Sequence, residues 1–309
     1  MNMTEINIYY LGIDGGGSRT TAALADKDGN VILRATGESI NFYSVGMENA
    51  RKNLSDVINK IYTSIGESKF YATFIGCSAL DDEADKETVE ALCGGIIDAD
   101  FLAMSSDVHV ALIASGSNCV AICGTGSMAV GKKADGSIAV TGGWGHIIGD
   151  EGSAYSIAVK ALRECCGMRD RNERTPLIES AEKFFEVDDF RKAIDKIYSE
   201  NTAKDYIARF AKNVAELSEK GCEISRRILC DEAAAFAKTV SALLYEIGGS
   251  PMLSLYGGVF QHNAFFRDEF MKNIRISHPL QASEILNITP EEGAIKAARL
   301  LPCKNTMNT

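Results

Sequence analysis

The amino-acid sequence predicts an α/β protein built from two similar halves. Residues 6–35 alternate apolar stretches with tight turns, in the order strand, glycine-rich turn, strand, turn, strand. The same order restarts at residue 118, after a mixture of helical and strand patterns. A dinucleotide-binding fold would place a helix directly after its first glycine-rich turn, so the strand found there indicates an antiparallel start to each sheet. The restart predicts two domains related by duplication, each presenting one hairpin to a shared cleft.

The remaining elements follow from the spacing of apolar residues. In the first half we expect strands at residues 6–13, 20–26, 31–35, 71–77 and 101–105, and helices at residues 48–65 and 84–96. In the second half we expect strands at residues 119–123, 128–132 and 251–256, and helices across residues 153–246, 263–272 and 290–301, with a charged interruption near residues 167–176. The predicted domains are 1–114 and 115–309. Whether the last helix packs back on the first domain stays open.

Composition narrows the classes of function. Of the 309 residues, 46% are hydrophobic and 24% are charged, and the net charge of −10 gives no global basic field for nucleic acid or anionic lipid. An anionic substrate would therefore need local cationic donors. No stretch approaches the ~18 consecutive apolar residues of a membrane span, and the N-terminus lacks the pattern of a secretory signal. We expect a cytoplasmic protein without nucleic-acid or membrane partners.

The spacing of the cysteines indicates neither a disulfide framework nor a zinc site. There are nine of them, and no pair has the C-x-x-C spacing of a zinc knuckle or redox motif. We expect most of them to be reduced and buried as small apolar residues. Roles for Cys123 and for the adjacent pair Cys165 and Cys166 stay open.

The first glycine-rich hairpin has the composition of a phosphate-binding loop. Glycines let backbone N–H groups approach an anion, hydroxyl groups add donors, and an aspartate at the strand end can hold a hydrated Mg²⁺. An ordinary turn that needs glycine for its backbone angles is the alternative. No Walker sequence is present in the chain. The candidate residues are Asp14 for the metal and Gly15, Gly16, Gly17, Ser18 and Thr20 for phosphate.

Two later glycine-rich segments also follow predicted strands. Gly124, Thr125, Gly126 and Ser127 repeat the logic of the first hairpin, and two such loops in equivalent places predict a nucleotide held between two half-molecules. Gly257 and Gly258 come after the strand at residues 251–256, where a flat adenosine could lie close to the backbone. A purely structural turn is the alternative at this third segment.

The segments together resemble a known family. The sequence is similar to the BadF/BadG/BcrA/BcrD ATPase family and its N-acetylglucosamine kinase branch, within the actin and sugar-kinase superfold of two ribonuclease H-like domains. Residues 14–21 and 124–127 resemble the two phosphate loops of the family, and residues 254–260 resemble its adenosine segment. Residues 142–155 resemble its sugar-kinase segment and are the most specific match. The matches run in the expected order along nearly the whole chain.

The resemblance implies roles for residues between the loops. Asp107 would be the catalytic base, which accepts the proton of a sugar hydroxyl as that oxygen attacks the γ-phosphate of ATP. An N-cap of the following helix is the alternative or an additional role for Asp107. Asn41 would hydrogen-bond the sugar, or else be an ordinary loop asparagine.

The sugar-kinase segment supplies further candidates. Gly143, Trp144 and Gly145 would line the sugar pocket, although Trp144 could instead fill a core. Asp150 would contact sugar hydroxyls. Asp150, Glu151 and Ser153 are also candidates to cap the helix that starts near residue 153, and the role of Glu151 stays open.

The expected function is an ATP- and Mg²⁺-dependent amino-sugar kinase that phosphorylates the 6-hydroxyl of N-acetylglucosamine or a close relative. N-acetylmuramic acid, glucosamine and N-acetylmannosamine are not separated by the sequence. A homodimer is common among the proteins that the chain resembles. One alternative is an ATPase that activates a partner enzyme through an iron–sulfur cluster, which would need a ligating cysteine in each subunit. Another is a sugar sensor that has lost the transfer reaction.

Overall fold

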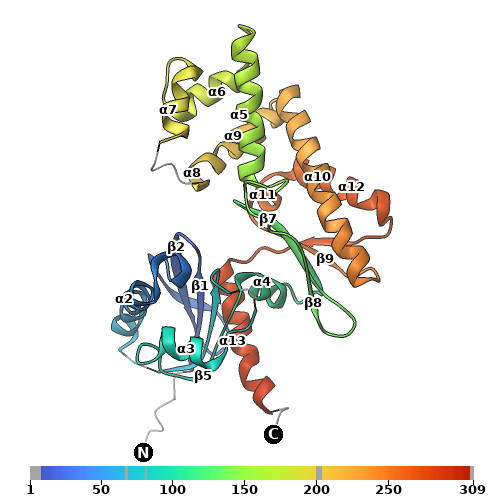
Figure 1. Cartoon of the computed structure of the whole chain (residues 1–309). Helices are drawn as coiled ribbons and strands as arrows, with labels where there is room; N and C mark the ends of the chain where they lie inside the picture. Colours follow the sequence, from blue (N-terminus) through green and yellow to red (C-terminus); the bar gives the residue numbers. More distant parts are fainter. Residues whose placement is uncertain (1–7, 67–68, 81, 200–203, 307–309) are drawn as a thin grey trace, which may run out of the picture. The chain divides into compact units, whose positions relative to one another are not determined.

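The computed structural model describes residues 8–66, 69–80, 82–199 and 204–306. The chain divides into two compact units (Figure 1). Unit 1 comprises residues 1–116 and 288–309, and unit 2 comprises residues 117–287. Each unit contains one five-stranded sheet.

The sheet of unit 1 has the strand order β3-β2-β1-β4-β5. Its strands are β1 (Tyr10–Gly15), β2 (Arg19–Ala25), β3 (Val31–Glu38), β4 (Phe70–Cys77) and β5 (Ala99–Ser105). The first three strands are antiparallel neighbours, whereas β4 and β5 lie parallel to β1 on its other side. The register places Asp14 between Thr21 and Gly76.

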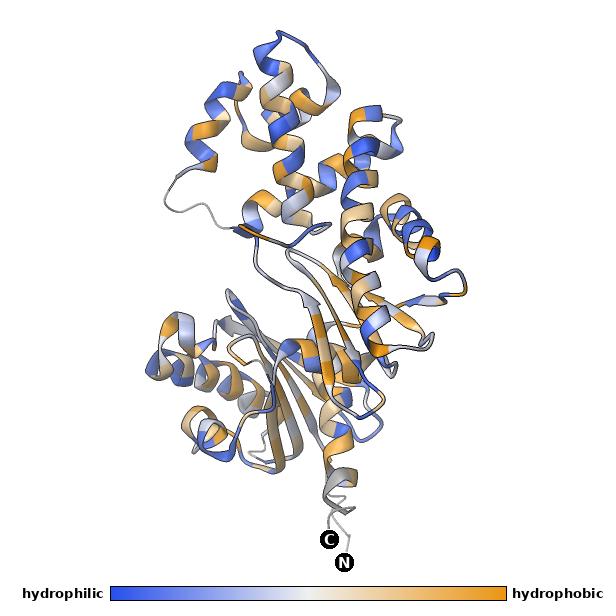
Figure 2. Cartoon of the chain, turned by 45° about the vertical axis from the view of Figure 1, so that its right-hand side comes forward, coloured by the Kyte–Doolittle hydropathy of each residue, from blue (hydrophilic) through white to orange (hydrophobic). Residues whose placement is uncertain are grey.

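Helices cover both faces of this sheet. They are α1 (Phe42–Val45), α2 (Met47–Ile65), α3 (Lys86–Cys93), α4 (Asp107–Ser115) and α13 (Pro290–Thr306). One face packs on α2 and α3, with Leu54 and Ile58 buried among the strand residues. The other face packs on α4 and α13, where Val110, Ala294 and Ala298 surround Phe74. Figure 2 shows the apolar colours concentrated in the strands between these helices.

The helix α13 lies very close to the sheet. A Cβ at Gly12 would stand 2.2 Å from the carbonyl oxygen of Glu291 and 2.5 Å from the backbone nitrogen of Ile295, so only glycine fits at this point of β1. Three of the buried residues of α13 are alanines, Ala294, Ala297 and Ala298, whose small side chains permit the same close approach. The C-terminal segment thus completes the apolar core of unit 1.

The sheet of unit 2 repeats the topology of the first sheet. Its order is β10-β9-β6-β7-β8, with β6 to β8 antiparallel and with β9 and β10 parallel to β6. The strands are β6 (Cys119–Cys123), β7 (Ser127–Lys132), β8 (Ile138–Gly142), β9 (Leu253–Tyr256) and β10 (Ser283–Ile285). The predicted α/β fold with two duplicated halves is therefore confirmed.

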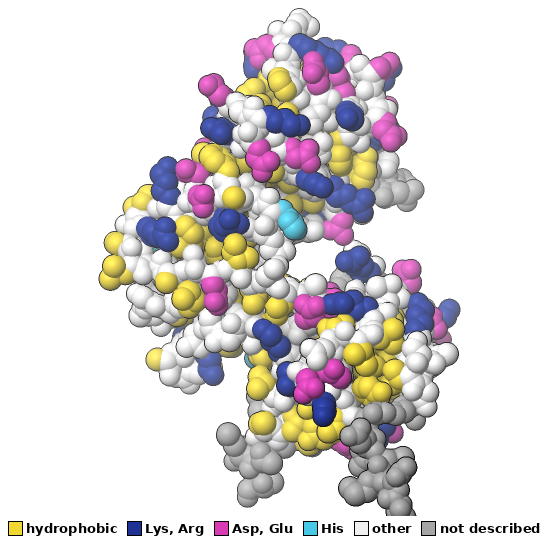
Figure 3. Space-filling model, turned by 180° about the vertical axis from the view of Figure 1, so that it is seen from behind, with side chains coloured by type: hydrophobic (Ala, Val, Ile, Leu, Met, Phe, Trp, Pro, Cys, Tyr) yellow, Lys and Arg dark blue, Asp and Glu magenta, His cyan; other side chains and the backbone are white. Residues whose placement is uncertain are grey.

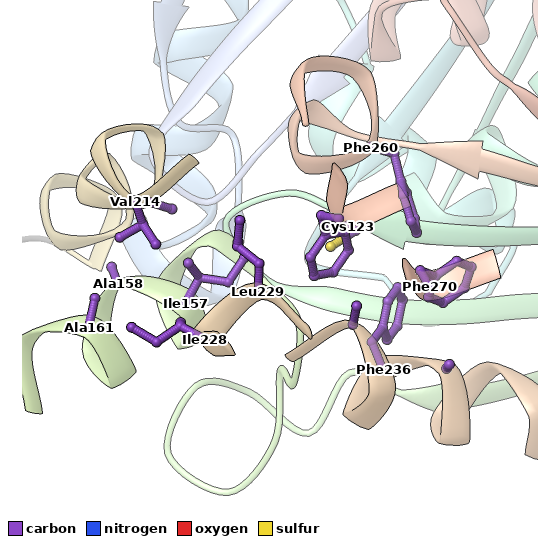
Figure 4. Packing of buried hydrophobic residues seen from close by; sticks show 14 of the residues in the cluster. Cys123, Ile157, Ala158, Ala161, Val214, Ile228, Leu229, Phe236, Phe260 and Phe270 are labelled. Carbon is purple, nitrogen blue, oxygen red and sulfur yellow. The ribbon is translucent and has the colours of Figure 1, made fainter. Parts of the chain in front are cut away.

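Unit 2 carries more helix than unit 1. Its helices are α5 (Ala154–Asp170), α6 (Pro176–Phe185), the 3-10 turn η1 (Phe190–Lys192), α7 (Ala193–Ile197), α8 (Lys204–Ala208), α9 (Phe210–Glu219), α10 (Glu223–Ile247), α11 (Gly258–His262) and α12 (Ala264–Ser277). Figure 4 shows Phe236, Phe260 and Phe270 packed together beside Cys123 in its core. None of the helices in the described part of the chain is long and apolar enough to cross a membrane.

The differences from the expected elements are local. The helix expected at residues 84–96 runs only from Lys86 to Cys93, because Asp85 caps its first turn and the backbone leaves the helix at Gly94. The helix α5 continues to Asp170, past the predicted interruption at Gly167. Residues 6 and 7 of the first expected strand lie outside the described residues. The short strand β10 and the short helices α1 and α11 were not expected.

Candidate functional site

The first hairpin of unit 1 has an open tip. The glycines Gly15, Gly16 and Gly17 all have negative φ, so the turn does not need glycine for its backbone angles. A Cβ at Gly15 would stand 2.6 Å from the Ile40 side chain, whereas a Cβ at Gly17 would meet no atom within 4 Å. Ser18 is exposed beside Gly17. The missing side chain at Gly17 therefore leaves free space at the tip of the loop.

The hydroxyl group of Thr20 is occupied within the sheet. Thr20 is fully buried, and its Oγ1 donates to the carbonyl oxygen of Glu38 at 2.8 Å. Ser39 likewise donates its hydroxyl to the carbonyl oxygen of Gly16 at 2.8 Å. These two bonds fix the hairpin against β3 and the chain that follows it.

Asp14 and Asp107 belong to one acidic site in unit 1. Asp14 on β1 is level with Gly76 on β4, and Gly76 is level with Ser105 on β5, two residues before Asp107. Burial raises the pKa of the Asp14 carboxyl from 3.8 to about 7, with smaller contributions from the charges of Asp107 and Glu291 and an opposing one from Arg19. The site therefore has an excess of carboxylates, which is the environment that a divalent cation stabilises.

Asp107 is the first residue of α4, not its cap. The cap is Ser106, whose Oγ accepts from the backbone N–H of His109 at 3.2 Å. The expected capping role thus falls to the neighbouring residue, and the Asp107 carboxyl is left available. Its side chain reaches the surface, but the surrounding atoms desolvate it and raise its pKa, against a smaller lowering by the backbone amide of Val108.

Asn41 is tied to the first glycine-rich hairpin through Ser78. The Oδ1 of Asn41 caps α1 by accepting from the backbone N–H groups of Tyr43 and Ser44, both at 3.1 Å. Its Nδ2 donates to Ser78 Oγ at 3.0 Å, and Ser78 donates its hydroxyl to the carbonyl oxygen of Gly15 at 3.1 Å. Sequence reasoning missed Ser78, although a hydroxyl residue directly after β4 is a usable signal.

The second glycine-rich hairpin, at residues 124–127 of unit 2, contacts the start of α5. The backbone N–H of Ala154 donates to the carbonyl oxygen of Gly124 at 2.9 Å. Gly124 has negative φ, and a Cβ there would meet no atom within 4 Å, as at Gly17. Ser127 donates its hydroxyl to the carbonyl oxygen of Glu151 at 2.7 Å, which joins the hairpin to the segment before α5.

Asp150 is buried beside this hairpin. Its backbone has a φ of 63°, and its side chain is 4% exposed. One carboxylate oxygen accepts from the backbone N–H of Ser127 at 3.3 Å, and the other accepts from Lys204 Nζ at 2.7 Å. The cap of α5 is Ser153, whose Oγ accepts from the N–H of Ser156. Asp150 is therefore held toward the second glycine-rich hairpin, with Lys204 as its counter-charge.

The tip of the segment at residues 142–155 is exposed. Trp144, Ile147 and Ile148 have exposed fractions of 74%, 86% and 76%, so the alternative that Trp144 fills a core is wrong. Gly143 and Gly145 flank Trp144 and both have positive φ. The segment therefore presents three large apolar side chains that unit 2 does not cover.

The third glycine segment lies at a cavity of about 720 Å³ in unit 2. Gly257 has a φ of 106°, and a Cβ there would stand 2.4 Å from the carbonyl oxygen of Cys123, so its glycine is required structurally. Gly258 has no such requirement, since the nearest atom to its Cβ position is 3.9 Å away. The cavity also contains Gly124 and Thr125, so it joins the second hairpin to the third segment.

Charged residues of α8 and α9 line the same cavity, and sequence reasoning missed them. Asp205, Arg209, Lys212 and Glu216 recur at spacings of three and four residues, which places them on one helical face. That periodic polar face was the available signal.

Cys123, whose role the sequence left open, is fully buried. Its Sγ donates to the carbonyl oxygen of Gly152, and burial raises its pKa.

The repeated sheets with a glycine-rich hairpin in each define an α/β protein of the actin and sugar-kinase superfold. Solved structures agree with this fold. A Chromobacterium violaceum protein assigned as an N-acetylglucosamine kinase matches with a TM-score of 0.70, at 20% identity over 93% of this chain and 98% of that one. A ROK family glucokinase from Streptomyces griseus, in complex with glucose and AMPPNP, matches with a TM-score of 0.63, at 14% identity over 96% of this chain and 99% of that one.

The chain belongs to the BadF/BadG/BcrA/BcrD ATPase family, whose model matches residues 11–298. It is 30% identical to an N-acetylmuramic acid/N-acetylglucosamine kinase of Clostridium acetobutylicum, over 88% of this chain and 92% of that protein. It is 28% identical to an N-acetyl-D-glucosamine kinase of Dictyostelium discoideum, over 92% of this chain and 96% of that protein.

Proposed function

We propose that this protein is an ATP-dependent amino-sugar kinase. It transfers the γ-phosphate of ATP to the 6-hydroxyl of N-acetylglucosamine or a close relative, such as N-acetylmuramic acid or glucosamine. The observation that carries the proposal is shared by three loops. Gly17, Gly124 and Gly258 each have negative φ and open space at the Cβ position, so neither backbone angle nor packing requires glycine there. Close approach of a ligand to the backbone is the physical reason that is left.

ATP occupies the cavity of unit 2 and the two hairpins in this proposal. The adenosine lies against Gly257 and Gly258, where the cavity of about 720 Å³ is large enough for it. Gly124, Thr125, Gly126 and Ser127 are the proposed phosphate contacts of unit 2, and the loop from Gly15 to Ser18 with Thr20 is the proposed phosphate contact of unit 1. Because the hydroxyls of Thr20 and Ser127 are engaged within their own units, backbone groups, Ser18 and Thr125 provide the direct contacts.

Asp14 fits a hydrated Mg²⁺. Its carboxyl is desolvated beside Asp107 and Glu291, and the nearby Arg19 compensates only part of that charge. A cation bound there would stabilise the ionised carboxylate and so oppose the rise in pKa that burial causes. When bound, Mg²⁺ supplies charge neutralisation to the β- and γ-phosphates.

Asp107 acts as the base toward the sugar. Desolvation by the surrounding atoms raises its pKa, so it accepts a proton more readily than a fully hydrated carboxylate as the sugar oxygen attacks phosphorus. Its position at the N-terminus of α4 fixes the carboxylate on a rigid element. In phosphoryl transfer most of the acceleration comes from positioning and charge stabilisation, which the rigid Asp14 and Asp107 site provides.

The proposed sugar contacts are Asn41, Gly143, Trp144, Gly145 and Asp150. Asn41 keeps one N–H hydrogen beyond its bond to Ser78, whereas its oxygen already accepts from two backbone N–H groups, so it would act as a hydrogen-bond donor to the sugar. The exposed Trp144 offers an apolar face for the sugar ring or its acyl group. We also propose that the protein is cytoplasmic and forms a homodimer, and light scattering of the purified protein would test the dimer.

Coupled ADP release tests this function. Wild-type protein is mixed with ATP and Mg²⁺ and is offered N-acetylglucosamine, N-acetylmuramic acid, glucosamine or glucose. We expect an amino sugar to stimulate ADP release, and Asp107→Asn to lower kcat by about a thousandfold. The control is Asp100→Asn, which changes an exposed aspartate paired with Lys69. Failure of every sugar to stimulate ADP release, or full turnover by Asp107→Asn, would overturn the proposal.

A further inference from the structure

A second cavity lies in the helical part of unit 2. Its volume is about 640 Å³, and residues of α5, η1, α7 and α8 line it, together with His146 from the segment before α5. Figure 1 shows these helices in the upper part of the drawing. Apolar side chains such as Val159, Leu162 and Ile207 form part of the wall. None of the three glycine-rich loops contributes to it.

The charge of this cavity is opposite to that of the chain. Four cationic residues line it, namely Arg163, Arg169, Arg191 and Lys204, against one acidic residue, Asp170. The whole chain has a net charge of −10, and basic and acidic side chains are interspersed on the face seen in Figure 3. The cavity therefore concentrates positive charge on a molecule that repels anions overall.

Two of these cations have no counter-charge of their own. Arg169 is paired with Asp189 at 2.9 Å, and Lys204 is paired with Asp150. Arg163 and Arg191 make no ion pair with any residue in the described part of the chain. Arginines that are left unpaired at the wall of a partly apolar cavity are typical of a site for a carboxylate or a phosphate.

Lys204 connects this cavity to the proposed sugar site. Its Nζ lies 2.7 Å from Asp150 and 5.8 Å from the centre of the Tyr155 ring, and the Tyr155 ring contacts His146 edge to face. An ammonium group has three hydrogens, and the bond to Asp150 uses one of them. Lys204 can therefore hold Asp150 and a second anion at the same time. An acceptor bound at Asp150 would have this second anion site directly beside it.

We propose that this cavity is an acceptor subsite for an acidic substituent of the amino sugar, with Lys204 in contact with its carboxylate and with Arg163 and Arg191 as the attracting charges. The proposal rests on the amino-sugar kinase function above and names its substrate class. N-acetylmuramic acid, which appears in the name of the Clostridium acetobutylicum relative, has such a carboxylate on a short lactyl group. Its reach limits direct contact to the residue next to Asp150, so the arginines act over a longer range.

The test compares N-acetylmuramic acid with its neutral lactyl amide and with N-acetylglucosamine. The measured quantity is the ratio of kcat/KM for the acid to kcat/KM for the amide, because general damage to the enzyme cancels in that ratio. We expect a ratio of about ten in the wild type, the size of one charge-assisted hydrogen bond. The ratio should fall as the salt concentration rises, since mobile ions screen exposed arginines.

The variants are Arg163→Met combined with Arg191→Met, and separately Lys204→Met. The double variant should bring the ratio to about two or three and leave N-acetylglucosamine turnover unchanged. Lys204→Met should also lower the ratio, while it slows both sugars because Asp150 loses its counter-charge. The control is Arg275→Met, an exposed arginine on α12, which should keep the wild-type ratio.

A wild-type ratio near one would overturn the subsite. So would a double variant whose ratio is as high as that of the Arg275→Met control. These results differ from failure of the kinase function itself, in which N-acetylglucosamine would also fail to stimulate ADP release.

Discussion

At the scale of single residues, the raised pKa of Asp14 predicts an unusual dependence of stability on pH. The pKa is 3.8 when the chain is unfolded and about 7 when it is folded, so the folded protein binds more protons between these values. The contribution of Asp14 to the unfolding free energy is therefore fully present below pH 4 and is lost as the pH rises through 7.

Asp14→Asn should remove this loss. In Mg²⁺-free buffer we expect the unfolding free energy of the wild type to fall by roughly 2 to 4 kcal/mol more than that of the variant between these pH values, with allowance for partial solvent screening. Urea unfolding at a series of pH values measures it. Parallel pH profiles for the two proteins would show that Asp14 does not titrate in this way.

Ser78 gives a second prediction at this scale. Ser78→Ala removes the hydroxyl that joins Asn41 Nδ2 to the Gly15 carbonyl, so the Asn41 amide loses one of the bonds that orient it. We expect KM for the sugar to rise about fivefold, with a smaller change in KM for ATP, in steady-state assays. Because Ser78 acts through Asn41, Ser78→Thr, which keeps a hydroxyl, should restore part of the affinity. Equal effects on both substrates would point to a general loss of structure instead.

At the scale of loops and helices, the glycines separate into two kinds. Gly124→Ala places a methyl group in open space where a ligand is proposed, so KM for ATP should rise about tenfold while the melting temperature stays within about 2 °C of the wild type.

Gly257→Ala forces a Cβ to 2.4 Å from the carbonyl of Cys123 at a φ of 106°, so it should lower the free energy of unfolding by at least about 2 kcal/mol. Calorimetry and ATP titrations distinguish the two. A large loss of stability in Gly124→Ala would mean that its glycine serves the fold.

Most strands and the glycine-rich loops were predictable from the sequence. The alternation of apolar residues located most strands, and the restart at residue 118 correctly indicated a repeated sheet, because both signals are local. Ser78 and Lys204 were missed because their partners lie 37 and 54 residues away, at Asn41 and Asp150. Local periodicity carries no information about such pairs. The glycine pattern located the loops but could not tell Gly124 from Gly257, since φ and neighbouring atoms decide that difference.

At the scale of the whole molecule, the C-terminal helix sets how the chain can be divided. The helix α13 buries Ala294, Ala297 and Ala298 against Phe74 and Val110 of unit 1. Residues 117–287 form a unit with its own core. We expect a fragment of residues 117–287 to unfold cooperatively, whereas residues 1–116 alone should expose the part of their sheet that α13 covers and should aggregate. Circular dichroism and light scattering test this, and a soluble, cooperatively folded 1–116 fragment would contradict it.

The central claim concerns where the γ-phosphate goes. Phosphorus NMR of ATP, Mg²⁺, N-acetylglucosamine and the protein follows the phosphate directly. We expect a phosphate-ester signal, split by the two protons of the C6 methylene group, to grow together with ADP, and neither to form at a comparable rate with Asp107→Asn. Formation of inorganic phosphate alone, with or without sugar, would contradict the assignment of this chain as an amino-sugar kinase.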